Sequence, residues 1–150
     1  MHRLSLKAMV ACAALFLNSV AQAQQPAPLA PLPPPPYGDP ITLEQAKKVA
    51  ASAETEARKL NLSDAIAIVE PDGKVVFFLK MDGTQYAGNM AIDKAATAAR
   101  FRRATTASDA DKVGGLPIVI GGKLVGAIGI AGGSGPQDAQ VAAAGLVAVK

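Results

Sequence analysis

The stretch from Gly114 to Asp138 reads GGLPIVIGGKLVGAIGIAGGSGPQD and has nine glycines in 25 residues. Within it, the residues of the run KLVGAIGIA are expected to alternate between the two faces of a β-strand, and the residues on one of these faces are all modest in size. Glycine inside a strand weakens that strand and usually marks the close approach of another element. The helix expected to begin near Pro136 is rich in alanine as well. We therefore expect a sheet against which a helix or a second subunit packs at short range.

The GGSG turn before this helix raises the question of an anion site, because free amides at a helix start bind phosphates. The chain contains neither a Walker A nor a G-x-G-x-x-G pattern. Ser134 and Gln137 have capping-box spacing, Pro136 removes one amide, and Asp138 would repel an anion. These features disfavour a nucleotide site, while binding of a carboxylate or propionate at Gly133 and Ser134 stays open.

The order of expected elements predicts an α+β fold. Thr42 and Gln45 form a capping box that starts a helix reaching about Asn61. Two hairpins are expected, one turning at residues 71–73 and one at the glycine pair 121–122. Further helices are expected over about 89–106 and from Pro136 onward. An antiparallel sheet built from two hairpins and covered by three helices is the predicted architecture.

The first 40 residues predict two segments ahead of the folded part. Residues 1–23 combine basic residues, an apolar run and the small-residue pattern Ala-Gln-Ala, which is typical of a secretory signal peptide. The apolar run is about 13 residues, too short for a membrane span of ~20. Residues 24–40 hold eight prolines in seventeen positions, which favours an extended linker over a docking peptide. The domain is then expected at 41–150, in a periplasmic or secreted protein.

Removal of the signal peptide would leave the mature chain without cysteine or histidine, because Cys12 and His2 are the single residues of each kind. Cysteine–histidine zinc sites and Ser-His-Asp triads are thereby excluded within one chain. Arg3 and Lys7 would leave too, so that 15 minus 2 basic residues face 12 acidic ones. A net charge near +1 gives no support for nucleic-acid binding.

Two segments together carry a resemblance to a known family. The sequence DKAATAARFRR at 93–103, followed by the glycine-rich segment at 114–145, resembles the GlcG/HbpS-like family over about residues 41–150. The resemblance implies a profilin-like fold, assembly into homo-oligomers and, in several members, binding of haem or a related tetrapyrrole. The segment 106–113 is shorter here than is usual in that family.

The polar candidates lie on the helix expected over 89–106. Lys94 and Thr97 are three residues apart, so they share one helical face and can meet a carboxylate ligand. Arg100 and Arg103 can pair with haem propionates, because guanidinium matches carboxylate geometry. The alternatives are a polar stripe that binds loop backbone and a solvated helix end.

The candidates for contacting a flat ligand or its iron flank the loop DGTQYAGN. Without histidine, Tyr86 is the first choice as iron ligand or stacking partner, and Met81 and Met90 follow. Methionine is also a common core filler, which is the competing interpretation for both.

The sequence therefore predicts an exported protein that binds a small molecule, with haem or a related tetrapyrrole as the first hypothesis. The alternative is a periplasmic structural or sensory oligomer that binds a small organic acid or no ligand. An enzyme is the third interpretation, because no spacing singles out Asp82, Asp93 or Lys94 for acid–base work.

Overall fold

The computed structural model describes residues 33–109 and 112–150. Residues from Pro33 to Lys150 form one compact unit, whereas the expected signal peptide and most of the proline-rich segment lie outside the described residues. The elements follow in the order α1 (Leu43–Lys59), β1 (Ala65–Val69), β2 (Val75–Lys80), α2 (Gly88–Phe101), β3 (Gly115–Ile120), β4 (Lys123–Ala131), α3 (Gly135–Leu146) and a 3₁₀ turn, η1 (Val147–Val149).

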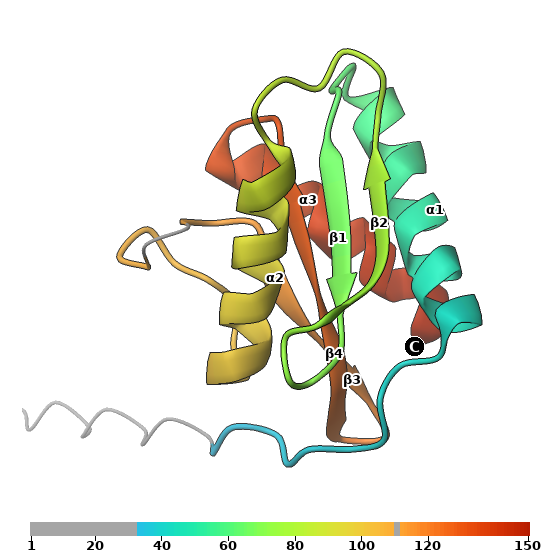
Figure 1. Ribbon diagram of the computed structural model, residues 1–150, viewed down its shortest axis with the longest axis vertical. Coiled ribbons are helices and arrows are strands. Elements are labelled where there is room, and N and C mark those ends of the chain that lie inside the picture. Colours follow the sequence, from blue (N-terminus) through green and yellow to red (C-terminus); the bar gives the residue numbers. More distant parts are fainter. Residues whose placement is uncertain (1–32, 110–111) are drawn as a thin grey trace, which may run out of the picture. The chain divides into compact units, whose positions relative to one another are not determined.

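The four strands form one antiparallel sheet in the order β2-β1-β4-β3. Each predicted hairpin is present, and pairing of β1 with β4 joins the two hairpins in the middle of the sheet. Figure 1 shows these strands with the three α-helices around them. The α+β class is confirmed. Among the described residues, no helix has both the length and the apolar character that crossing a bilayer requires.

Strand β1 shows how the two faces of the sheet differ. Its five residues are all buried and alternate between two clusters. Ile66 and Ile68 belong to the large cluster with α1 and α3, while Ala65 and Ala67 belong to the alanine-rich cluster with α2. One face thus holds two helices over bulky side chains, and the other holds α2 over small ones.

Helix α2 packs very close to the sheet because glycines lie beneath it. A Cβ on Gly129 of β4 would collide with the backbone of α2 at Ala91 and Ala95, and a Cβ on Gly115 of β3 would collide with the Lys94 carbonyl. The short-range packing expected from the glycine-rich stretch is therefore present within the chain itself.

The end of the proline-rich segment is part of the folded unit. Leu124 N–H donates to Pro36 O at 2.8 Å, and Gly38 N–H donates to Leu124 O at 2.7 Å. The guanidinium of Arg102 lies 5.0 Å from the centre of the Tyr37 ring. The compact unit thus begins before residue 41, which was its expected start.

Helix α2 ends at Phe101, five residues before the expected end near Thr106. Arg102 adopts a left-handed conformation with φ of 54°, and such a residue ends a helix. Its side chain donates to Pro35 O at 3.3 Å and stacks on Tyr37. The early end of α2 thus coincides with contacts to Pro35 and Tyr37, which are distant in sequence. A prediction from helical periodicity uses only neighbouring residues and cannot include such contacts.

Gly129→Ala tests the close packing of α2. The added methyl meets helix backbone that cannot move aside alone, so we expect a loss in free energy of unfolding of about 1–3 kcal/mol or more, measured by urea denaturation. Gly88→Ala, whose Cβ would meet only the end of the Phe78 ring at 3.4 Å, is the control and should leave stability unchanged or raise it. Equal stability of both variants would contradict the packing described here.

Candidate functional site

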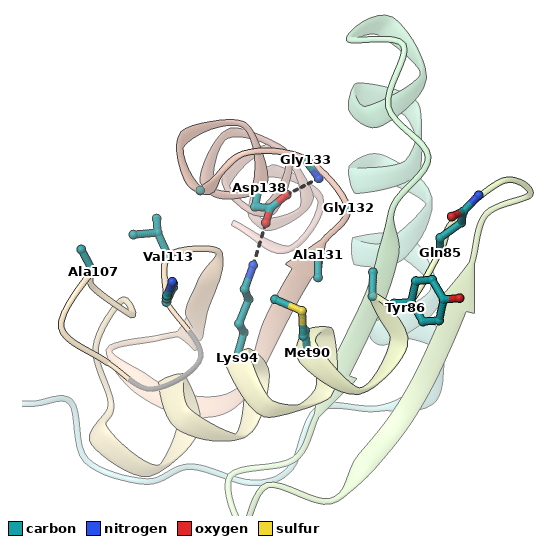
Figure 2. A pocket seen from close by; sticks show the side chains of 13 residues that line it. Gln85, Tyr86, Met90, Lys94, Ala107, Val113, Ala131, Gly132, Gly133 and Asp138 are labelled. Carbon is teal, nitrogen blue, oxygen red and sulfur yellow. Dashed lines mark hydrogen bonds and ion pairs between the residues drawn. The ribbon is translucent and has the colours of Figure 1, made fainter.

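A cavity of about 430 Å³ opens beside the start of α2 and the turn that follows β4. Its volume lies within the range of about 300–1,000 Å³ found for small-molecule sites. Figure 2 shows residues from the loop before α2, from α2, from the segment before β3 and from the turn after β4 around it. Its lining residues are Gln85, Tyr86, Ala87, Met90, Lys94, Ala107, Lys112, Val113, Ala131, Gly132, Gly133, Gly135 and Asp138.

The centre of the site is an ion pair between Lys94 of α2 and Asp138 of α3. Lys94 Nζ donates to Asp138 Oδ2 at 2.6 Å and to Ile130 O at 2.8 Å. Both side chains are 3% exposed. The other oxygen of Asp138 accepts from Gly133 N–H at 2.9 Å. A buried pair needs such additional hydrogen bonds, because desolvation offsets much of the attraction between the charges.

Asp64 lies next to this pair and is itself fully buried, directly before β1. Neither of its carboxylate oxygens has a hydrogen-bond partner among the described residues. Burial, followed by repulsion from Asp138, raises the pKa of Asp64 to about 6, although attraction to Lys94 acts in the opposite direction. A carboxyl with this pKa carries a proton for part of the time near neutral pH.

The carboxyl of Asp64 packs against the turn that forms one wall of the cavity. Gly132 has a φ of 153°, and a Cβ at this position would collide with Asp64 Oδ1. Glycine is thus required here both by the backbone conformation and by space. Gly132 thus lines the cavity and also packs against Asp64, which is not among the lining residues.

Four of the residues predicted from the sequence line the cavity: Tyr86, Met90, Lys94 and Gly133. Tyr86 is 95% exposed with φ of 53°, and its hydroxyl points away from Lys94 (Figure 2). Met90 is about half exposed. Tyr86 and Met90 belong to the entrance, whereas Lys94 belongs to the inner wall.

The other predicted residues lie elsewhere. Met81 is a buried member of the large core cluster, and Ser134 N–H donates to Gln137 Oε1 at the start of α3. The remaining three lie further along α2 or just after it. They are Thr97, which is half-buried; Arg100, which stacks on Phe101 beside a separate pocket; and Arg103, which pairs with Asp109 at 2.8 Å.

Sequence reasoning missed Asp64, Lys112 and the structural role of Asp138. Asp138 was considered only as a group that would repel an anion at the start of α3, but it is buried against Lys94. Asp64 directly precedes the apolar run AIAIV, and an acidic residue adjoining a buried strand was the available signal. Among the described residues, no group of three or more histidine, cysteine, aspartate or glutamate side chains is suited to a metal ion.

Comparison with known proteins identifies the family. The sequence model described as "Haem degrading protein HbpS-like" matches residues 41–147. The chain belongs to the HbpS-like family. Protein GlcG of Escherichia coli K12 is 31% identical over 107 residues, which cover 60% of this chain and 80% of GlcG.

Solved structures show the same fold as this member of the HbpS-like family. A double mutant of HbpS from Streptomyces reticuli is 27% identical, with a TM-score of 0.69 over 84% of this chain and 99% of that one. A complex of PduOC with haem is 23% identical, with a TM-score of 0.67 over 74% of this chain and 96% of that one.

The Lys94–Asp138 pair can be tested by a double-mutant cycle. Lys94→Met leaves the buried Asp138 carboxylate without its cation and should lower the free energy of unfolding by about 3–5 kcal/mol. Asp138→Asn removes the bonded partner of Lys94 but leaves the Asp64 carboxyl nearby, so its loss should be smaller. The double variant should lose less than the sum of both. Urea denaturation measures all four proteins, and additive losses would show that the two side chains do not act as a pair.

Proposed function

We propose that this protein binds haem or a related tetrapyrrole in the cavity beside Lys94 and Gly132. The observation that carries the proposal is that the cavity is formed entirely by residues of the segment that matches the HbpS-like family. Its volume suits a small-molecule ligand. The haem complex of PduOC, which has the same fold, supports the choice of ligand.

The residues of the cavity suit the parts of such a ligand. Ala87, Met90 and Val113 offer apolar surface to a porphyrin face. Lys112 offers a cation for a propionate, since an ammonium binds carboxylates as a point charge. Tyr86 offers a phenol oxygen, which is an established type of haem-iron ligand. When bound, the haem supplies the redox and oxygen chemistry, while these residues bind and orient it.

A second candidate function is supported by Lys94. An ammonium on the inner wall of the cavity also suits a small organic acid without a porphyrin ring. In that case the protein is a structural or sensory oligomer rather than a haem carrier.

We also propose that the protein is exported and forms homo-oligomers. The charged, apolar and small-residue parts of segment 1–23 support export. Exposed apolar side chains support assembly, among them Val75 and Phe78 on the edge strand β2, which are 45% and 39% exposed. An unpaired strand edge with apolar side chains is a surface that proteins usually cover.

Titration with hemin tests the haem proposal. We expect a saturable Soret change with the wild-type chain and high-spin iron, because the expected ligand is an oxygen. Tyr86→Ala should shift the Soret maximum and weaken binding at least several-fold. Tyr86→Phe, which keeps the ring, should shift the maximum to a similar degree and weaken binding less.

Tyr37→Ala is the matched control, because Tyr37 stacks on Arg102 and does not line the cavity. Its Soret titration should resemble that of the wild type. Absence of any saturable Soret change would reject haem in favour of the small-acid candidate. Saturable binding that Tyr86→Ala leaves intact would reject Tyr86 as the ligand and point to Met90.

Light scattering on residues 33–150 tests assembly. We expect a dimer or a larger species, because a domain of this size gains stability by covering apolar surface. Phe78→Lys should shift the population toward monomer. Lys80→Glu on the same strand is the control, because it changes charge without removing apolar surface, and it should leave the oligomeric state unchanged. A wild-type monomer at high micromolar concentration would contradict the proposal.

A further inference from the structure

Three ionisable side chains lie close together beside the cavity, and their charges do not sum to zero when all three are ionised. Lys94 of α2 supplies one positive charge, while Asp138 of α3 and Asp64 before β1 supply two carboxyls. Asp64 is fully buried and both of its oxygens lack a hydrogen bond within the described part of the chain. With both carboxyls ionised, the cluster holds an excess negative charge that water does not reach.

Lys94 also has donor capacity to spare. A lysine ammonium has three N–H groups, and the two bonds seen within the described residues go to Ile130 O and Asp138 Oδ2. Lys94 forms part of the cavity wall, and no acceptor for its third N–H is seen within the described residues. A carboxylate is the acceptor that such a donor binds most strongly.

A carboxylate bound at Lys94 would add a third negative charge to a cluster with one positive charge. Such a cluster binds a proton more readily, because nearby negative charge and burial both favour the neutral form of a carboxyl. Asp138 accepts hydrogen bonds from Lys94 and Gly133. Asp64 accepts none on its side-chain oxygens within the described residues, so we take it to be the carboxyl that binds the proton.

We propose that the cavity binds its ligand by a carboxylate at Lys94, and that Asp64 takes up a proton in the same event. The proposal rests on the proposed function in that it uses the same cavity. It names the ligand chemistry as a carboxylate, which haem propionates and small organic acids share. It also assigns to Asp64, behind Gly132, a role in binding without contact with the ligand.

The direction of the pH dependence follows from the charges around Asp64. In the free protein its pKa is about 6, raised by burial and Asp138 and opposed by Lys94. Asp82 and Arg58 lie beside Ser63 and Met81 around a surface hollow, and they are not among the causes of this shift. A bound carboxylate raises the pKa further. Affinity should therefore be highest below pH 6 and fall above it, by up to about tenfold per pH unit, until the pKa of the complex is passed.

Calorimetry with hemin and with propionate tests the proposal. Each probe is titrated into the full chain at neutral pH in buffers of different ionisation enthalpy, which reports the protons taken up. With propionate we expect net proton uptake by the wild type and none by Asp64→Asn, which keeps the shape of the side chain but cannot ionise. With hemin the measure is the difference in protons taken up between the wild type and Asp64→Asn, because a phenol that binds iron releases its own proton. Asp82→Asn, which changes an exposed carboxyl outside the cavity, should behave like the wild type.

Carboxyl ¹³C NMR of the wild type provides a measurement that does not depend on a variant. The Asp64 resonance should titrate near pH 6 in the free protein and at higher pH with propionate present. Propionate binding without proton uptake, uptake with propionate that persists in Asp64→Asn, or an Asp64 midpoint that propionate does not move would each overturn the proposal.

The outcomes for the two probes separate this proposal from the haem proposal. If propionate binds with proton uptake at Asp64 and hemin does not bind, the carboxylate site stands and the haem function fails. If hemin binds but propionate binds without proton uptake, haem binding stands and the role of Asp64 is rejected. If neither probe binds saturably, both are rejected.

Discussion

The ion pair between Lys94 and Asp138 is the interaction on which the site depends. It joins α2 to α3, and the additional bonds to Ile130 O and Gly133 N–H attach both to the end of β4 and its turn. Removing two charges from water is costly, and only a close geometry with further hydrogen bonds compensates for it. Such a pair holds three separate parts of the chain in one arrangement.

Small residues make this geometry possible. Gly115 and Gly129 allow the backbone of α2 to approach the sheet so closely that no side chain fits between them. Lys94, which starts from this helix, can therefore reach the Ile130 carbonyl on β4. With bulkier residues in the sheet, α2 would lie further away and the ammonium would lose its acceptors. The alanine-rich face is thus part of the site as well as part of the core.

Within the part of the chain that the structure describes, Asp64 departs from the rule that buried polar groups have hydrogen-bond partners. Departures of this kind are expected where function rather than stability determines a residue. In this member of the HbpS-like family the unpartnered carboxyl lies behind the glycine turn of the cavity. In the proposed binding event, this position lets Asp64 take up a proton when a carboxylate occupies the cavity.

Much of the fold could be predicted from local patterns. The capping boxes at Thr42 and Ser134, the two hairpin turns and the α+β class all depend on residues close in sequence, and the structure contains each of them. The sequence also makes candidates of four residues that line one cavity in the structure: Tyr86, Met90, Lys94 and Gly133. The tertiary structure alone decided the contacts between residues that are distant in sequence. These include the pairing of β1 with β4, the early end of α2 at Arg102 and the bond between Lys94 and Asp138, 44 positions apart. Caps and turns depend on near neighbours, whereas the burial of a charge depends on which distant segments pack around it.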